Sequence, residues 1–449
     1  MTEIADYIDR HFDRFVDELI DWCLQPSVSA QHLGIAEMSK LVVEKMRHVR
    51  LQAEIYPVED GHPFVVGRLA GEKPTTILFY NHYDVQPIEP ESAWVSPPFE
   101  PTIRDGKLYA RGTSDNKGTL LARLHAIEAI LETRGRLPVT VKFLVDGEEE
   151  IVSPSLPGFV DSHHDLLQAD VCIWESGQKN AHGQLEIELG NKGVLIIELT
   201  AQTIKRDYHG QFAPLLPNAG WALIWTLGTL KGPDDRVKIE GFYDNVATPS
   251  AAELALYSKM SIKDRELREA AGVSSLIGGA TGTEANRRHL GDPTCNICGF
   301  ETGYNGPGFK TAVPATALAK LDIRLVPNQD PDDIWEKLVR HLDRYASPGV
   351  TVRRLARGYT SSTSADHWFV DLVADAARSV YSNPPEIHPR MGGFTPRYVI
   401  SRWNNIPIVG SGVGYAESGP HAPNEHIRLE DYRDGIKHMA EVLIRLGER

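Results

Sequence analysis

The sequence predicts an α/β fold in which a larger domain with a mixed sheet carries a smaller inserted α+β domain. Between residues 34 and 175, apolar runs of strand length alternate with longer helical patterns, which is typical of a sheet covered by helices. Residues 191–357 change to a strand, an apolar helix, a second strand and a second helix, which suits a compact insertion. We therefore expect the larger domain to comprise residues 1–190 and 358–449.

Five apolar runs predict strands of the larger domain. Each is too short for a helix and rich in residues that favour extended chain. A helix is expected from Thr119 to about Arg134, because apolar side chains recur on one stripe and Gly135 follows as a stop signal. The five runs lie within residues 77–84, 108–112, 139–145, 171–174 and 406–409.

Acidic residues and histidines stand where these predicted strands end. Because the carboxyl ends of strands in an open α/β sheet share one crevice, we expect these side chains to meet. The run from Asp146 to Glu150 holds four acids in five residues, which repel one another after a buried strand unless cations neutralise them. The pattern predicts a two-metal hydrolytic site. Its members are His82, Asp84, Asp115, Glu149, Glu150, Glu175 and His421.

Single members of this set also have structural interpretations. Asp84 lies two residues beyond His82 on an extended chain, so it is expected to accept the ring N–H of His82 and orient that histidine towards a metal. A lone His-x-Asp pair is nevertheless common by chance. Asp115 lies just before a helix, where a carboxylate can simply cap the helix. The combination, rather than any one residue, favours a metal site.

Six stretches of the chain together resemble a known family. They are His82–Pro87, Asp105–Gly112, Ser114–Gly118, Glu149–Glu150, Arg324–Pro331 and His421–Glu425. The chain is similar to the zinc metallopeptidase superfamily of carnosinase-type dipeptidases, aminoacylase, glutamate carboxypeptidases, acetylornithine deacetylase and succinyl-diaminopimelate desuccinylase. This resemblance implies a catalytic domain with an inserted lid and dimerisation domain, and a homodimer.

The resemblance also implies a ligand set for two Zn²⁺ ions per chain. Asp115 would bridge both ions. His82 and Glu175 would complete one ion, and Glu150 and His421 would complete the other. Because carboxylate-rich sites also accept other metals, Mn²⁺ and Co²⁺ are alternatives to Zn²⁺.

The general base is assigned by the same resemblance. Glu149 would take a proton from the attacking water and return it to the leaving amine, with Asp84 as a second catalytic residue. In the family the adjacent acid pair is followed by a Gly-Ser-like turn, whereas residues 151–153 here are Ile-Val-Ser. The register of the base therefore stays open among Glu148, Glu149 and Glu150.

Four residues of the inserted domain and its surroundings resemble residues of the family that touch substrate. His209 matches a lid histidine that reaches into the partner's active site and helps hold the oxyanion. Arg324 matches an arginine that pairs with the substrate carboxylate, with a surface ion pair as the alternative. Asn218 either contacts substrate or caps the helix that follows it. Gly393 lies in a loop whose backbone approaches the substrate carboxylate in relatives.

The motifs predict an enzyme that hydrolyses dipeptides or small peptides with a free carboxylate. The stretches Val85–Pro87 and Asn328–Pro331 are closest in wording to the carnosinase-like dipeptidases. Glu175 favours the alternative of an N-acyl amino acid deacylase, since family members that cleave from the amino end tend to carry aspartate at this ligand. A third hypothesis, an inactive homologue that binds metal or ligand, is disfavoured by the retention of Glu149 and all five ligands.

The composition of the chain limits the classes of partner that it can bind and the cell compartment in which we expect it. The chain has 47 basic and 61 acidic residues and a net charge of −14, which argues against nucleic acid and anionic membrane. Residues 1–24 read as one acidic amphipathic helix without signal-peptide features, and no apolar run approaches about 18 residues, so we expect a cytoplasmic protein. Cys295 and Cys298 fall in a predicted strand that turns them to opposite sides, so they are expected to be structural.

Overall fold

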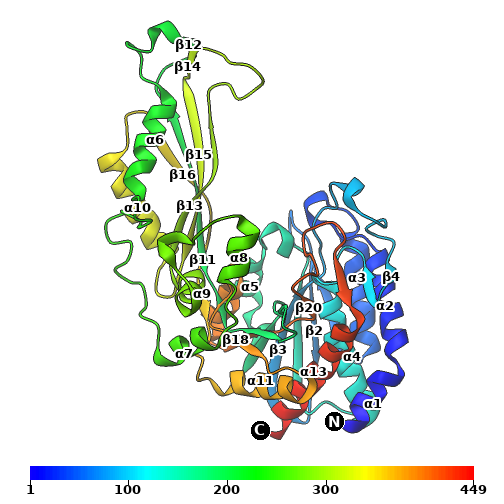
Figure 1. Cartoon of the computed structure of the whole chain (residues 1–449). Helices are drawn as coiled ribbons and strands as arrows, with labels where there is room; N and C mark the ends of the chain where they lie inside the picture. Colours follow the sequence, from blue (N-terminus) through cyan, green and yellow to red (C-terminus); the bar gives the residue numbers. More distant parts are fainter. The chain divides into compact units, whose positions relative to one another are not determined.

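The computed structural model describes residues 1–449, apart from the side chain of Asn404, and the chain divides into two compact units (Figure 1). Unit 1 comprises Met1–Gly190, Ser362–Pro389 and Thr395–Arg449. Unit 2 comprises Asn191–Ser361 and Arg390–Phe394. Unit 2 is thus inserted in the sequence between the first and last segments of unit 1. Among the described residues, no helix is both long enough and apolar enough to cross a membrane.

A mixed eight-stranded sheet forms the centre of unit 1. Across the sheet the strands follow the order β1 (Gln52–Tyr56), β2 (Phe64–Leu69), β6 (Val139–Asp146), β3 (Lys73–His82), β7 (Val171–Trp174), β19 (Ile408–Gly410), β9 (Glu186–Glu188) and β18 (Glu386–His388). β3 runs parallel to both β6 and β7, so the carboxyl ends of these three strands meet at one edge. β6 is buried along its whole length, as expected for a strand covered on both faces.

Helices cover both faces of this sheet. They are α1 (Thr2–Arg10), α2 (Phe12–Leu24), α3 (Ile35–His48), α4 (Lys117–Arg134), α5 (Leu156–Leu167), α11 (Trp368–Val380), α12 (Arg397–Asn404) and α13 (Leu429–Glu448). α5 and α12 pack on the face that Leu78 and Tyr80 present. α4 lies on the opposite face, with the Arg123 guanidinium over the Phe79 ring, and α13 packs beside α4.

Short strands complete unit 1 around the edge at which β3 and β6 end. β4 (Thr102–Arg104), β5 (Lys107–Tyr109) and β21 (His426–Arg428) form a three-stranded sheet, and β8 (Gln178–Lys179) pairs with β20 (Gly414–Tyr415). The pairing of β21 with β5 brings a segment near the end of the chain beside the segment that precedes α4. Distant parts of the sequence are thereby joined next to the predicted metal ligands.

Arg123 ties α4 to the strand ends. Its side chain is buried, and Nη1 donates to the carbonyl oxygen of Tyr80 at 2.7 Å and to Oδ1 of Asn81 at 2.5 Å. Nη2 donates to the carbonyl oxygen of Trp174 at 2.6 Å. One guanidinium thus donates to backbone carbonyl oxygens near the ends of two neighbouring strands. The carboxyl ends of β3 and β7 are therefore fixed relative to the helix that follows Asp115.

The first 24 residues correct one expectation. They form two helices, α1 and α2, rather than one, because His11 leaves the helical region with φ −107° and ψ 10°. The ring nitrogen Nδ1 of His11 lies 2.8 Å from the carbonyl oxygen of Tyr7. A local bond from a side chain to the backbone competes with continuation of the helix, and this competition is not visible in hydrophobic periodicity.

A four-stranded antiparallel sheet organises unit 2. Its order is β13 (Thr294–Thr302), β15 (Thr316–Leu325), β11 (Gly193–Gln202) and β16 (Val350–Gly358). Short strands are β10 (Gly190–Asn191), β12 (Tyr208–His209), β14 (Ala312–Val313) and β17 (Ser361–Ser362). The helices are α6 (Ala219–Leu230), α7 (Ala251–Lys259), α8 (Asp264–Ala271), α9 (Gly282–Gly291) and α10 (Pro331–Tyr345). The expected helices at 219–230 and 331–345 are confirmed; α7, α8 and α9 were not predicted.

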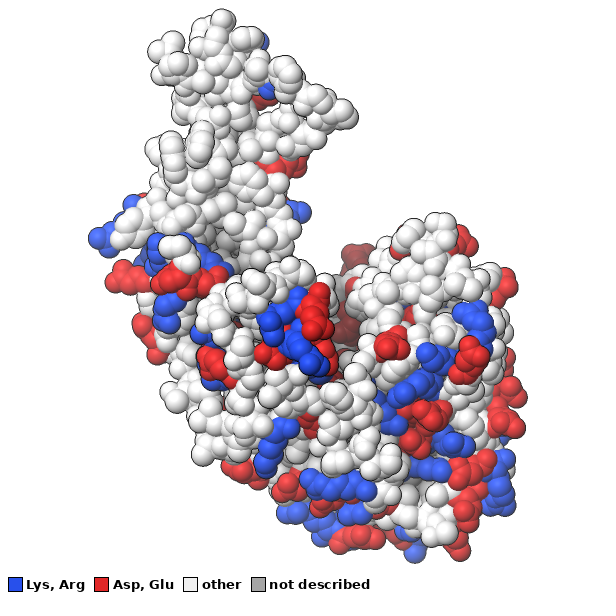
Figure 2. All heavy atoms as spheres, in the orientation of Figure 1, with Lys and Arg blue, Asp and Glu red and all other residues white. Residues whose placement is uncertain are grey.

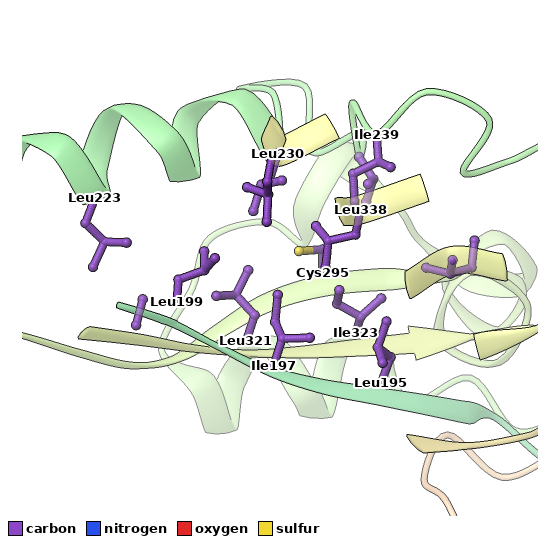
Figure 3. Packing of buried hydrophobic residues seen from close by; sticks show 14 of the residues in the cluster. Leu195, Ile197, Leu199, Leu223, Leu230, Ile239, Cys295, Leu321, Ile323 and Leu338 are labelled. Atoms are coloured by element: carbon purple, nitrogen blue, oxygen red, sulfur yellow. The ribbon is translucent and has the colours of Figure 1, made fainter. Parts of the chain in front are cut away.

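The core of unit 2 lies between one face of this sheet and the helices α6 and α10 (Figure 3). Alternate residues of β11, such as Leu195 and Leu199, belong to this core together with Leu223 of α6 and Leu338 of α10. Cys295 belongs to the same core, whereas Cys298 is exposed and its thiol donates to a backbone carbonyl. The two cysteines face opposite environments, which confirms the structural interpretation of this pair.

The distribution of charge differs between the two units. In Figure 2 acidic and basic side chains are interspersed over the visible surface of unit 1. The part of unit 2 around β12, β14 and α6 shows few charges. Large apolar side chains are exposed there instead, including Trp221, Ile224 and Trp225 of α6.

Candidate metal centre

Unit 1 places the five predicted metal ligands at the ends of its elements. His82 is the last residue of β3, and Asp115 lies in the turn before α4. Glu150 follows β6 in the 3-10 turn η3 (Glu149–Ile151), and Glu175 follows β7 directly. His421 lies in the loop between β20 and β21. The parallel pairing of β3 with β6 and β7 explains why side chains from separate motifs meet.

Asp115 is the centre of the cluster. Its Oδ1 lies 3.0 Å from Nε2 of His82, and its Oδ2 lies 3.1 Å from Nε2 of His421. The same nitrogen of His421 lies 3.0 Å from Oε2 of Glu150. Ligand atoms of His82, Asp115 and Glu150 lie within 4.8 Å of one another. One carboxylate thus offers an oxygen to each of two histidines, as a carboxylate that bridges two ions must.

Glu175 approaches the cluster from β7. Its side chain is buried, and it interacts electrostatically with both His82 and Asp115. Burial raises the pKa of Glu175 to about 7, His82 opposes this shift, and the negative charge of Asp115 adds to it. The carbonyl oxygen of Glu175 accepts a hydrogen bond from Nδ2 of Asn116 at 3.4 Å. Glu175 therefore stands close to the same centre as the other four residues.

The cluster has an excess of negative charge that cations would relieve. Hydrogen bonds to Asp115 and Glu150 raise the pKa of His421 to about 10. Burial acts to lower the pKa of His82, yet its hydrogen bonds to Asp115 and Asp84 hold it well above the usual value. Protons are thus retained on both histidines where metal ions would otherwise sit. Two imidazoles and two further carboxylates around the shared carboxylate of Asp115 are a donor set that fits two Zn²⁺ ions.

The three consecutive glutamates after β6 have different surroundings. Both carboxylate oxygens of Glu148 accept backbone hydrogen bonds. Oε1 accepts from the N–H of His62 at 2.8 Å, and Oε2 accepts from the N–H of Ser155 at 3.0 Å. Glu150 contacts His421. Among the described side chains, the Glu149 carboxylate makes no hydrogen bond, and burial together with neighbouring carboxylates raises its pKa well above the usual range. Of the three, Glu149 alone has a carboxylate without a hydrogen bond to a described residue, and its role as the base stays a prediction.

The turn after these glutamates has a left-handed backbone. Val152 has φ 74° and Ser153 has φ 45°, where L-residues with a side chain are disfavoured. In the family that the sequence resembles, a Gly-Ser-like turn follows the acid pair. Glycine adopts a left-handed conformation without steric cost. A left-handed turn at Val152 and Ser153 therefore follows the three glutamates, and the choice of the base among them stays a prediction.

Asp84 has a different set of contacts from the one expected. The shorter contact of the His82 ring nitrogen Nδ1 is the backbone carbonyl oxygen of Asp84 at 3.0 Å, and the carboxylate oxygen Oδ1 is 3.4 Å away. The carboxylate of Asp84 accepts the backbone N–H of Glu149 at 3.1 Å and that of Glu150 at 3.0 Å. Asp84 thus fixes both the histidine at the end of β3 and the acidic turn after β6.

Glu425 is the last residue of the motif His421–Glu425, and no role at the site was predicted for it. Its carboxylate is fully buried and accepts hydrogen bonds from the turn that ends in Asp115. Burial acts to raise its pKa, and Arg111 opposes that shift, with a net rise above the usual value. The local signal was an acid between a rigid Pro-Asn loop and a short strand, and its partners far away in sequence could not be inferred from that signal.

The four predicted substrate-binding and oxyanion residues all belong to unit 2. His209 is exposed in β12, and its Nδ1 accepts the N–H of Gln211 at 3.1 Å. Asn218 caps α6, with Oδ1 accepting from a backbone N–H at 3.2 Å, and Arg324 is paired with a neighbouring aspartate at 2.9 Å. The carbonyl of Gly393 accepts a backbone N–H at 3.1 Å. The cap and ion pair expected as alternatives are therefore present; the contacts with substrate stay predictions.

The fold and the donor set define a metal-dependent hydrolase with a mixed α/β catalytic sheet and an inserted α+β domain. The model of "Peptidase family M20/M25/M40" matches residues 78–445, and the chain belongs to this family. The expected fold class and superfamily are thereby confirmed.

Relatives across the whole chain agree with this assignment. The Cys-Gly metallodipeptidase of Schizosaccharomyces pombe is 29% identical over 97% of this chain and 96% of its own length. The Beta-Ala-His dipeptidase of Homo sapiens is 27% identical over 100% of this chain and 93% of its own. Among solved structures, an M20 family metallo-carboxypeptidase from Sulfolobus solfataricus has a TM-score of 0.91 and 37% identity, covering 97% of this chain and 99% of that one.

Proposed function

We propose that the chain is a binuclear metallopeptidase that hydrolyses the amide bond of dipeptides or other small peptides with a free carboxylate. The observation that carries this proposal is the position of Asp115 between His82 and His421, with one carboxylate oxygen towards each. The names of the relatives support it, because dipeptidases and a metallo-carboxypeptidase both act next to a free carboxyl terminus.

The proposed ligands are those that the sequence predicts. Asp115 is shared, His82 and Glu175 complete one position, and Glu150 and His421 complete the other. Zn²⁺ is the proposed metal, with Mn²⁺ and Co²⁺ as alternatives. When bound, two adjacent cations lower the pKa of a water molecule and polarise the scissile carbonyl. The chain's own contribution is to hold the ligands at fixed positions through Asp84 and the strand ends.

Glu149 is the proposed general base. Its carboxylate takes a proton from the attacking water and returns it to the leaving amine. The support is its difference from its neighbours, since the carboxylate of Glu148 is occupied by two backbone N–H groups and that of Glu150 contacts His421. A pKa raised by burial suits a carboxylate that must hold a proton between the two steps.

The substrate is proposed to be recognised by residues of unit 2. Arg324 pairs with the free carboxylate, an interaction for which the planar guanidinium is suited. The backbone around Gly393 approaches the same carboxylate, and Asn218 contacts the substrate beside it. His209 is proposed to act in the partner's active site, where it stabilises the oxyanion. In this proposal unit 1 is the catalytic domain and unit 2 is the lid and dimerisation domain.

The proposed oligomer is a homodimer formed through unit 2. Trp221 and Trp225 are 55% and 62% exposed on α6, and Ile297 and Phe300 are 51% and 44% exposed on β13. β13 is also an edge strand, whose unpaired backbone groups favour association with another chain. Aromatic side chains are enriched at the centres of interfaces. A cytoplasmic location is proposed from the unpaired cysteines.

A deacylase of N-acyl amino acids is the second candidate, and Glu175 is the observation that favours it. The two candidates differ at the amino end of the substrate, where a peptidase accepts a free amine and a deacylase requires an acyl group. A panel of dipeptides, their N-acetyl derivatives and their carboxyl amides separates them, with zinc-loaded and chelated protein compared.

We expect cleavage of free dipeptides, loss of cleavage on amidation of the carboxylate, and no activity with chelator. Cleavage confined to the N-acylated compounds would assign a deacylase. Activity that survives the chelator, or none on any compound, would contradict both candidates.

A further inference from the structure

Glu425 is a buried carboxylate saturated with hydrogen-bond donors. Oε2 accepts from Nη1 of Arg111 at 2.8 Å and from the backbone N–H of Gly112 at 2.9 Å. Oε1 accepts from the backbone N–H of Ser114 at 2.9 Å and from that of Asp115 at 3.0 Å. Four good donors on one ionised carboxylate make a strong set of hydrogen bonds, because charge-assisted bonds exceed neutral ones in strength. The turn from Arg111 to Asp115 is thus wrapped around a single side chain.

This arrangement fixes the backbone that carries the central ligand. Gly112 has φ 88°, which allows the chain to curl so that N–H groups of residues 112, 114 and 115 converge. Such convergent amides form a concave anion site, and here the anion is a side chain of the protein itself. The backbone N–H of Asp115 is held directly, so the direction in which the Asp115 side chain leaves the turn is set by Glu425.

The same residue is joined to the loop that carries His421. The backbone carbonyl of Glu425 accepts the N–H of Ala110 at 3.1 Å, and the next residue, His426, pairs with Tyr109 in the β21–β5 ladder. Only three residues separate Glu425 from His421. The turn before α4 and the loop after β20 are therefore connected at one point, and each of them supplies a ligand.

We propose that Glu425 is a positioning residue that sets the distance between Asp115 and His421 and so preorganises the second metal position, where Asp115, Glu150 and His421 meet. The inference rests on the proposed function, because it assumes that these side chains bind metal. Glu425 itself does not approach the metal; it acts through the backbone of Asp115. Outer residues of this kind tune metal affinity by holding the ligands in place.

A purely structural role for Glu425 makes a different prediction. Arg111 is buried, and its Nη2 donates to the carbonyl of Pro87 at 3.1 Å, so Glu425 could serve only as the counter-charge for this guanidinium. Removing one partner of a buried pair is costly, whereas removing both together is often tolerated. The single variant Glu425→Gln therefore cannot separate the two roles. The double variant Arg111→Met with Glu425→Gln separates them, because it removes the buried ion pair and leaves the turn with one neutral amide oxygen in place of two charged carboxylate oxygens.

The test is a Co²⁺ titration of metal-free protein, followed by visible absorption and by the number of ions bound per chain. Wild type, both variants and Glu430→Gln are compared, the last being a matched loss of one exposed carboxylate on α13. Thermal unfolding of the metal-free proteins is measured in parallel. For the double variant we expect cooperative unfolding at a lowered melting temperature, because three backbone N–H groups lose their charged acceptor. We also expect an altered Co²⁺ spectrum and second-ion affinity reduced at least about tenfold. Glu430→Gln is expected to match wild type.

Two results would count against specific parts of the account. If the double variant binds two ions with the affinity and spectrum of wild type, Glu425 is only the partner of Arg111 and the inference is wrong. If wild type itself fails to bind two ions, the proposed function is wrong before the role of Glu425 is reached. Neither readout depends on peptide hydrolysis, so a failure to find the substrate leaves the test intact.

Discussion

Oδ2 of Asp115 lies 3.1 Å from Nε2 of His421, although Asp115 precedes α4 and His421 follows β20. The other oxygen of the same carboxylate faces His82 at 3.0 Å. This arrangement makes Asp115 the common neighbour of two histidines that come from different parts of unit 1. The predictions below concern the chemistry at this centre and the fold that supports it.

Glu149→Gln is expected to remove turnover without removing metal. A glutamine cannot accept the proton of the attacking water, and loss of a positioned base reduces rates by roughly 10²- to 10⁴-fold. Glu148→Gln is the matched neighbour, because the Glu148 carboxylate accepts two backbone N–H groups. That variant is expected to lose about 1–3 kcal/mol of unfolding free energy while turnover persists. Metal content, initial rate and denaturant unfolding of the two variants decide the matter; loss of metal from Glu149→Gln would move the base assignment.

Val152→Gly is expected to stabilise unit 1. Val152 is a β-branched residue with φ 74°, and its side chain is 62% exposed, so little packing is lost when it is removed. Relief of backbone strain should outweigh the greater freedom of glycine in the unfolded chain and add about 1 kcal/mol to the unfolding free energy. Val152→Ala is the control, because alanine keeps the steric conflict. Equal melting temperatures for the glycine and alanine variants would contradict this explanation.

The stability of the metal-free protein is expected to depend on His438 at acid pH. Burial lowers the pKa of His438 to about 4, from the usual 6.5 of an exposed histidine. Between these pH values the unfolded chain binds a proton that the folded protein excludes, so stability falls as the pH drops from 6.5 to 4 and is fully present above 6.5. The contribution is about 3 kcal/mol.

Replacement of His438 tests whether this histidine causes the predicted loss of stability as the pH falls. In His438→Gln the unfolding free energy should depend less steeply on pH between 4 and 6.5 than in wild type, whatever the effect of the substitution at neutral pH. Denaturant unfolding at several pH values, with chelator present in all samples, gives the two slopes. Identical slopes would show that His438 is not the group responsible.

Trp225→Glu is expected to convert the proposed dimer to a monomer. A charge at the centre of an apolar interface loses buried area and leaves an unpaired carboxylate, which costs several kcal/mol. Trp403→Glu is the control, since Trp403 is 43% exposed but lies in unit 1. Sedimentation velocity at micromolar concentration should give a monomer for the first variant and a dimer for the second. A wild-type monomer would refute the proposed interface outright.

The positions of the predicted ligands could be inferred from the sequence because they depend on local patterns along the chain. A short apolar run marks a buried strand, and the polar residue that ends it must lie at the sheet edge, as His82 and Glu175 do. The inserted domain was recognisable for a similar reason, since α6 is a continuous apolar run of helix length and β15 alternates between buried and less buried residues. Motif order then identified the family.

The contacts that position these ligands were not predictable in the same way. Asp84, Glu148 and Glu425 all use their carboxylates to accept backbone N–H groups from other segments, and no spacing along the chain encodes such pairs. The helix α8 has no buried residue, so its place in the fold could not be inferred from a face that packs on a core. The break at His11 arises from one side chain bonding to a carbonyl. Hydrogen bonds between distant segments, and side-chain bonds that interrupt a helix, can be identified only in the folded structure.

The most direct test of the central claim is the initial rate of dipeptide hydrolysis as Zn²⁺ is added to metal-free protein from zero to two equivalents per chain. We predict no hydrolysis without metal, full activity at two equivalents, and no hydrolysis of the same dipeptide amidated at its carboxyl end. Hydrolysis at full rate without metal, or no hydrolysis of any free dipeptide at two equivalents, would contradict the account of this protein as a binuclear metallopeptidase acting on free dipeptides.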